Sequence, residues 1–352
     1  MLKKRKKINF FVVILLLMSA VACRKDKPQP CSEPNGIECL DFKELETFQG
    51  ITFFSHERFQ FQSPCFNPNN PNEFVYNYKD FELDEFQLVK FNISTGIKTI
   101  LANNVKIISQ PKWSRKGWIA FDNVFEQNYQ LWIVKDNGDS LTQKSVSGGN
   151  ISPAWDSEGE NLFWLHSPNK PPSYPYYFFK QGVSNTITDT LMRDGDINQG
   201  SAVFNEISSQ NILLTNTIIN NEIHFAYAPL SSMSFTSIFN NSSQFKTDLI
   251  RGVAWSSNSQ IAYFTFYNNS DMDGLYKLNI NSGSFTKLIN FCHSKRYNSI
   301  SCSSNGTEIV GERIVSYTIK DSDGNFTGQI VENSEIFMID LVTLKETKIN
   351  LE

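Results

Sequence analysis

The sequence lacks the motifs on which many hydrolases and metal sites depend. It has no Gly-x-Ser-x-Gly pentapeptide, in which α/β-hydrolases place their nucleophile, and no Cys-x-x-Cys pair of the kind used by zinc knuckles and thioredoxin-like sites. No His-x-His or His-x-x-x-His spacing joins its four histidines, His56, His166, His224 and His293. We therefore expect no catalytic residues, no metal and no cofactor.

Long apolar runs and helical periodicity are also missing, except at the start of the chain. Residues 3–7 are basic, residues 10–18 are apolar, and small residues then lead to Cys23. The apolar run is shorter than the about 20 residues that span a bilayer, so the pattern is typical of a secretory signal. Because it ends in a cysteine, it resembles a bacterial lipoprotein signal, which implies a signal peptide at 1–22 and a lipid on Cys23. An ordinary signal peptide and an uncleaved anchor are the alternatives.

Positive charge is scarce once this segment is removed. The formal net charge of the full chain is −4, and loss of the five basic residues at 3–7 takes it to −9. An acidic exported protein does not attract nucleic acid, so we expect no nucleic-acid partner. Residues 23–45 are polar and rich in proline, which is typical of a flexible linker. We expect a membrane contact through the lipid anchor, at the bacterial outer membrane or cell surface.

The rest of the chain contains an internal repeat. A phrase with a central aromatic residue recurs along it, clearest as QPKWS at 110–114 and SPAWD at 152–156. Aligned on the aromatic position, the repeat gives anchors spaced by 47, 42, 49, 51 and 47 residues, at Phe66, Trp113, Trp155, Phe204, Trp255 and Cys302. A repeat of this length that holds several short strands is the signature of a β-propeller. We predict an all-β fold over residues 46–352, a six-bladed β-propeller with four-stranded antiparallel blades.

The residues around the anchors support this interpretation. A serine or glycine stands three residues before most anchors, small enough for six inner strands that converge on one axis. Residues that start turns stand one position after the anchors, at Asn67, Ser114, Asp156, Asn205, Ser256 and Ser303. Apolar runs that suit second strands buried between blades follow at 74–76, 118–121, 162–165, 212–214, 261–264 and 309–310.

The second repeat carries a family resemblance. It reads QPKWSRKGWIAF at 110–121, followed by LWIV at 131–134, and it resembles the WD-like propeller repeat of the TolB family. The third and fifth repeats are similar, through Pro153, Trp155, Gly159, Trp255 and 261–263. The resemblance covers about residues 46–352 and implies the propeller fold. Such repeats occur in binding proteins and beside peptidase domains, so the resemblance leaves the activity open.

The cysteines bear on how the ring closes. After Cys23, an odd number remains, at Cys31, Cys39, Cys65, Cys292 and Cys302. Cys65 and Cys302 fall on the inner strands of the first and last blades, which are neighbours in a closed ring. A disulfide between them would staple the closure, the alternative being that both are small buried residues. Blade six is completed either by its own carboxy-terminal strands or by an added strand from residues 51–54.

The links between second and third strands vary most, and they lie on the same face as the links between blades. Exposed aromatics and carboxylates there suit a protein or glycan partner. The candidate partner-binding residues are Tyr78, Asp80, Phe81, Tyr174 and Tyr317, with Arg251 and Asn298 at the mouth of the channel. We expect a non-enzymatic, lipid-anchored propeller that binds a protein or envelope polymer. The alternatives are a carbohydrate- or lactone-active propeller enzyme with a metal in its channel, and a structural subunit of a membrane complex.

Replacing the lipid-bearing cysteine tests the interpretation of the amino terminus. We expect Cys23→Ser to abolish the incorporation of radiolabelled fatty acid and to move the protein out of the membrane pellet, because a serine offers no thiol for the lipid. Cys31→Ser, which removes a thiol from the same linker, is the control and should retain both labelling and sedimentation. Equal labelling of the two variants would contradict the assignment of the lipid to Cys23.

Overall fold

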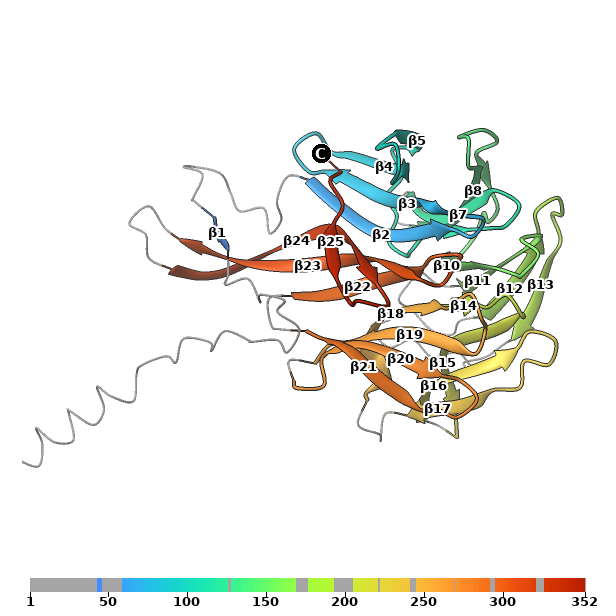
Figure 1. The fold of residues 1–352 in the computed structure, drawn as a ribbon. Coiled ribbons are helices and arrows are strands. Elements are labelled where there is room, and N and C mark those ends of the chain that lie inside the picture. Colours follow the sequence, from blue (N-terminus) through green and yellow to red (C-terminus); the bar gives the residue numbers. More distant parts are fainter. Residues whose placement is uncertain are drawn as a thin grey trace, which may run out of the picture. The chain divides into compact units, whose positions relative to one another are not determined.

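The computed structural model describes residues 43–45, 59–125, 128–168, 177–192, 205–220, 222–240, 245–268, 270–291, 295–320 and 326–351. These residues form six sheets around a central axis, and the sheets contain four consecutive antiparallel strands each (Figure 1). The only helical segment among them is a single 3-10 turn, η1 (Thr247–Leu249). No described helix has the length and apolar character needed to cross a membrane. The predicted six-bladed propeller is therefore confirmed, while the signal at 1–22 lies outside the described residues.

Each blade is built from one stretch of chain, numbered in order from the axis outward. Blades one to three comprise β2 (Phe59–Asn67), β3 (Asn70–Asp80), β4 (Glu85–Asn92) and β5 (Lys98–Asn103); β6 (Lys112–Trp113), β7 (Trp118–Phe125), β8 (Asn128–Lys135) and β9 (Thr142–Gln143); β10 (Gly149–Trp155), β11 (Asn161–Ser167), β12 (Tyr177–Gly182) and β13 (Thr188–Met192). Blades four to six comprise β14 (Asn205–Ile207), β15 (Ile212–Ile219), β16 (Glu222–Pro229) and β17 (Thr236–Asn240); β18 (Ile250–Trp255), β19 (Ile261–Phe266), β20 (Gly274–Asn279) and β21 (Phe285–Asn290); β22 (Lys295–Cys302), β23 (Glu308–Lys320), β24 (Phe326–Asp340) and β25 (Glu346–Lys348).

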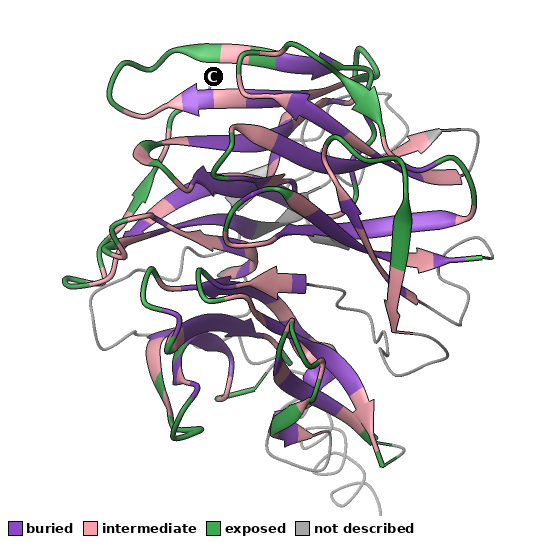
Figure 2. Cartoon of the chain, turned by 90° about the vertical axis from the view of Figure 1, so that its right-hand side faces the viewer, coloured by how far each residue is buried: buried purple, intermediate pink, exposed green. Residues whose placement is uncertain are grey.

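The core lies between the blades rather than at the axis. The predicted apolar runs fall on the second strands and are buried there, as with Phe74, Phe121 and Phe264, each 0% exposed. Successive side chains of a strand point to opposite faces, so each second strand contributes to the packing against both neighbouring blades. Figure 2 shows the result, with buried stretches along the strands and exposed ones on the connecting loops.

The predicted turn residues begin the link between first and second strands. Ser114 Oγ accepts a hydrogen bond from the backbone N–H of Trp118 at 3.0 Å, and Ser303 Oγ accepts one from Glu308 at 3.0 Å. Gly117 in the first of these turns has a φ of 74°, a conformation that favours glycine. The local rules read from the repeat are thus confirmed in these blades.

Blade four requires a correction. Its anchor is Ile207 rather than Phe204, since Ile207 ends the first strand and Ser208 takes the turn position, where its Oγ accepts the N–H of Ile212 at 3.2 Å. The predicted turn residue Asn205 instead begins β14. The alignment on aromatic residues selected Phe204, which lies three positions before the anchor that the structure shows. With Ile207 as anchor, the spacings on its two sides become 52 and 48 residues.

In the described residues, no strand of the first blade pairs with the last blade. Blade six takes β22 to β25 from the carboxy-terminal stretch, while residues 51–54, the other source of a strand considered from the sequence, lie outside the described residues. Each inner strand contacts the inner strands of both neighbours, including β2 with β22. One apolar cluster spans this seam, and its buried members are Phe61, Phe66, Phe74, Tyr76, Val89, Phe91, Val310, Ile336 and Leu351.

A buried carboxylate reinforces the seam. Glu312 on β23 is 5% exposed, and it accepts hydrogen bonds at 3.0 Å each from the N–H of Ser63 and from the hydroxyls of Ser299 and Ser334. Burial raises the pKa of Glu312, while these hydrogen bonds and the charge of Lys79 oppose the rise. The carboxylate therefore connects its own strand, β23, with β22 and β24 of blade six and with β2 of blade one.

Of the two alternatives for Cys65 and Cys302, the structure has the one without a disulfide, since both cysteines are free. Their thiols lie against different blades. Cys65 belongs to an apolar cluster with Trp113 of blade two. Cys302 lies near Ser257 and Tyr263 of blade five. Burial raises the pKa of Cys302 to about 12, as expected for an unreactive packed thiol.

Blade six differs from the others in the length of its central hairpin. β23 and β24 contain 13 and 15 residues, and in Figure 1 they extend beyond the ends of the other blades. The short strand β1 (Lys43–Leu45) pairs in parallel with the far part of β23, with Lys43 opposite Tyr317. The sheet of blade six thus gains a fifth strand from the residues before the first blade.

The seam carboxylate predicts a pH-dependent stability. Because the pKa of Glu312 is higher in the folded than in the unfolded protein, folding binds a proton more tightly, and stability is lost as pH rises from about 4 towards neutrality. We expect Glu312→Gln to gain stability relative to the original protein over that rise, measured by urea unfolding at each pH. Glu158→Gln, at an exposed position, is the control and should not alter the pH profile. A constant difference between Glu312→Gln and the original protein would contradict the assignment.

Candidate functional site

Two cavities lie along the propeller axis. The larger one, here called the mouth cavity, has a volume of about 630 Å³ and is lined by the first halves of the inner strands. The smaller one has a volume of about 250 Å³ and is lined by the turns that follow the anchors. The side chains that line both are Lys112 and Glu206, together with Asn205. These residues therefore stand between the two cavities.

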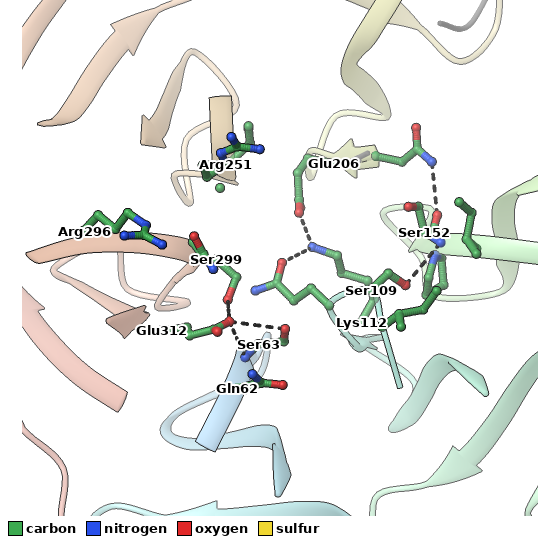
Figure 3. A pocket seen from close by; sticks show the side chains of 18 of the residues that line it. Gln62, Ser63, Ser109, Lys112, Ser152, Glu206, Arg251, Arg296, Ser299 and Glu312 are labelled. Atoms are coloured by element: carbon green, nitrogen blue, oxygen red, sulfur yellow. Dashed lines mark hydrogen bonds and ion pairs between the residues drawn. The ribbon is translucent and has the colours of Figure 1, made fainter. Parts of the chain in front are cut away.

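Lys112 and Glu206 form an ion pair across the channel (Figure 3). Their side chains are 14% and 15% exposed. They come from blades two and four and hold the same position, one residue before the anchor, where the other blades carry Cys65, Ala154, Ala254 and Ser301. Burial raises the pKa of Glu206, although Lys112 acts in the opposite direction. Two long charged side chains thus meet in the space that four small side chains leave open.

The backbone that carries the ion pair is fixed by tryptophan anchors. Trp155 Nε1 donates to the carbonyl oxygen of Lys112 at 2.9 Å, and Trp255 Nε1 donates to that of Glu206 at 3.0 Å. Lys112 Nζ also donates to Gln110 Oε1 at 2.6 Å. Each anchor therefore reaches back to the preceding blade and holds a channel residue in place.

A second buried carboxylate supports the wall of the mouth cavity. Asp122 on β7 is 0% exposed and accepts hydrogen bonds from the N–H of Ile108 at 2.9 Å and from the N–H and hydroxyl of Ser109. Burial raises the pKa of Asp122 against these hydrogen bonds. Ser109 Oγ in turn accepts the N–H of Ser152 at 3.2 Å. Asp122 thus helps to connect blades two and three through hydrogen bonds, as Glu312 connects blades six and one.

The inner strands are bulged where these carboxylates meet them. The pairing register shifts between Gln62 and Cys65 in blade one, and a similar shift occurs in blades three, five and six. Ser63 and Ser152 adopt φ values of 53° and 54° there. The small residues that the sequence places before the anchors therefore serve a β-bulge, which turns backbone N–H groups toward the neighbouring acid.

Two arginines line the mouth cavity from neighbouring blades. Arg251 stands on β18 and Arg296 on β22, and Figure 3 shows both at the same side of the cavity. The guanidinium carbon of Arg296 lies 4.7 Å from the ring centre of Tyr267, a cation–π contact. Asn298 also lines the cavity. The predicted position of Arg251 and Asn298 at the channel mouth agrees with this geometry.

The other predicted partner-binding residues do not join them. Asp80 is 2% exposed and caps the β3–β4 turn, where its Oδ1 accepts the N–H of Glu82 at 3.0 Å. The prediction that Asp80 faces a partner is therefore corrected. Tyr78 is half-buried and stacks on Phe59, with ring centres 6.2 Å apart.

Phe81 is half-buried and packs edge-on against Phe86, with ring centres 6.5 Å apart. It does not line the mouth cavity. Tyr174 lies outside the described residues, and Tyr317 is described only as a backbone position on β23, opposite Val331. Of the predicted set, Arg251 and Asn298 are the pair that the structure brings together.

The described residues contain no group of three or more His, Cys, Asp or Glu side chains arranged to hold a metal ion. His166 stacks on Phe179 with ring centres 4.4 Å apart, and burial lowers its pKa. His224 Nε2 and the carbonyl oxygen of Ile219 are 3.1 Å apart. Both histidines are thus placed as packing and hydrogen-bonding residues of single blades.

These observations define the class of protein: a six-bladed β-propeller with a polar cavity at one end of its channel. The sequence matches no protein-family model and no curated protein. Among solved structures, it resembles a protein described as TolB from Agrobacterium tumefaciens, with a TM-score of 0.52 and 9% identity over 78% of this chain and 90% of that one. At this identity the likeness concerns the fold.

Two further structures show how widely the fold is used. An oligogalacturonate lyase in complex with manganese gives a TM-score of 0.52 at 7% identity, over 83% of this chain and 77% of that one. The β-propeller domain of the Trilobed protease from Pyrococcus furiosus, described as having an open velcro topology, gives 0.50 at 10% identity, over 83% and 98%. Proteins with different descriptions therefore share this architecture, and the fold alone does not define an activity.

A double-mutant cycle tests the ion pair in the channel. We expect Lys112→Met to cost about 2 kcal/mol of unfolding free energy because it leaves a buried carboxylate unpaired. Glu206→Gln should cost a similar amount, and the double variant should cost at least ~1 kcal/mol less than the sum. The control cycle uses the more exposed pair of Lys348 and Glu335, 2.8 Å apart. Its coupling should not exceed about 0.5 kcal/mol. Equal coupling in the two cycles would contradict a special role for the channel pair.

Proposed function

We propose that the protein is a non-enzymatic, lipid-anchored propeller of the bacterial outer membrane or cell surface, and that its cavity-bearing face binds a protein or envelope polymer. The observation that carries the proposal is the mouth cavity itself. It is a polar hollow of about 630 Å³, within the size range of ligand pockets, and its charged side chains come from several blades. A site assembled on rigid strands in this way suits recognition.

The chemistry of the cavity favours binding over catalysis. Its two carboxylates already have partners, since Glu206 is paired with Lys112 and Glu312 accepts hydrogen bonds from three serines. A general base has to reach a substrate proton, and a nucleophile needs an adjacent base. In the described residues, the groups that could serve in these roles hold the ring together instead.

Site-specific photo-crosslinking in cells tests the proposal. A photoreactive amino acid at position 298, beside the mouth cavity, should give a discrete adduct in the native envelope. The same amino acid at position 158, an exposed site on a turn that follows an anchor, is the matched control and should give none. Adducts of equal strength at both positions, or none at 298, would contradict binding at this face.

The same experiment separates the alternatives. A structural subunit of a membrane complex should give an adduct with one protein in fixed stoichiometry. A propeller enzyme with a metal in its channel should carry about one divalent metal ion per chain, which elemental analysis of purified protein measures. We expect sub-stoichiometric metal and no turnover of envelope glycans.

A further inference from the structure

The mouth cavity offers hydrogen-bond donors with positive charge on one side. Arg251 and Arg296 present guanidinium groups, which only donate hydrogen bonds and which match the geometry of a carboxylate. Lys112 adds no net charge, since it is paired with Glu206. The arginine side of the cavity therefore selects an anionic acceptor.

The cavity also offers hydrogen-bond acceptors. Ser63, Ser109 and Ser299 line the cavity, and their hydroxyls donate to buried carboxylates. Ser63 and Ser299 donate to Glu312 (Figure 3), and Ser109 donates to Asp122. A hydroxyl that donates its one proton into the wall can offer only its oxygen lone pairs to a ligand. These serines therefore favour a ligand that donates hydrogen bonds of its own. A simple anion cannot do this, whereas a hydroxylated one can.

The volume and the lining residues of the mouth cavity further restrict the chemical class of its ligand. At about 630 Å³, the cavity is much larger than a single inorganic anion and has the size of a pocket for a small organic ligand. Peptide recognition relies on aromatic and apolar anchors in well-packed pockets. Among the described residues that line the cavity, Tyr267 is the one aromatic, and Ser, Asn and Gln form the largest group, eight of 19. Such a wall suits a ring with many hydroxyl groups.

We propose that the mouth cavity binds an acidic saccharide, with its carboxylate against Arg251 and Arg296 and its hydroxyl groups toward Ser109 and Ser299. This inference rests on the proposed function, because it names the chemical class of the polymer that the face binds. The sugar plane can lie against Tyr267, whose ring is already in contact with Arg296. The carboxylate and the hydroxyl groups thus each meet side chains that complement them.

Isothermal titration calorimetry with the full-length protein in detergent tests the proposal. The probes are uronic acid trimers of glucuronate, galacturonate and mannuronate, the neutral trimers of the same sugars, inorganic phosphate, and an acidic tripeptide. At least one uronate trimer should bind, and its neutral counterpart should bind at least tenfold more weakly. Raising the salt from 50 to 300 mM should weaken uronate binding at least threefold.

Variants assign the binding to the arginines. Arg251→Gln and Arg296→Gln should each weaken uronate binding at least tenfold, while their thermal unfolding should match that of the original protein. Arg115→Gln, at an exposed residue that lines the smaller cavity, is the matched control and should bind normally. The salt dependence of the original protein remains informative if an arginine variant fails to fold.

Several results would overturn the inference. They are equal affinity for the neutral and acidic trimers, tighter binding of phosphate or of the acidic peptide, an equal loss in Arg115→Gln, or no binding of any uronate. If crosslinking at position 298 still yields an adduct in these cases, the face binds a partner of another class and the proposed function stands. If crosslinking also fails, both proposals fall.

Discussion

The constraint on which the structure depends is closure of the ring at the seam between blades one and six. Since no described strand of blade one pairs with blade six, side chains hold this seam, as an apolar cluster and through Glu312. The position of every inner strand depends on both of its neighbours, so the seam also sets the shape of the channel. Arg296 and Ser299 belong to the blade at the seam, and the mouth cavity would widen or close with it.

The bulges explain why acids are buried beside the cavity. A bulge leaves backbone N–H groups without strand partners, and a buried donor without an acceptor costs free energy. In blade five, Thr265 supplies the acceptor, since its Oγ accepts the N–H of Gly252 at 2.8 Å. The bulges of blades one and three rely on acids of the neighbouring blades instead: Glu312 accepts the N–H of Ser63, and Asp122 accepts the hydroxyl of Ser109, whose Oγ accepts the N–H of Ser152. Burial raises the pKa of both acids, because it disfavours their charged form. An acid is the costlier solution, but it also orients the hydroxyls of neighbouring serines.

The sequence was sufficient for the fold and insufficient for most of the site. The repeat revealed the blades because each one solves the same local problem, with an anchor, a turn and a buried strand. The error in blade four had a consequence, since Phe204 in place of Ile207 hid Glu206 from alignment with Lys112. With the right anchor, two opposite charges stand out in a column of small residues. The choice between a disulfide and two packed thiols needed the structure. Cys65 precedes an anchor whereas Cys302 occupies one, and successive side chains of a strand point to opposite faces. Contacts such as Glu312 with Ser63 join distant repeats and leave no local pattern.

The ion pair between Lys112 and Glu206 decides what kind of site a propeller channel can be. An open channel admits a chain from end to end, whereas here the pair stands between two cavities that share it as lining. The mouth cavity is therefore approached from one face, and a ligand that enters meets a floor whose charges are already balanced. Selectivity then rests on the walls, where arginines and acid-oriented serines differ in what they can donate or accept. The same fold can thus serve lyases and binding proteins, because the residues that project into the channel are independent of those that build the blades.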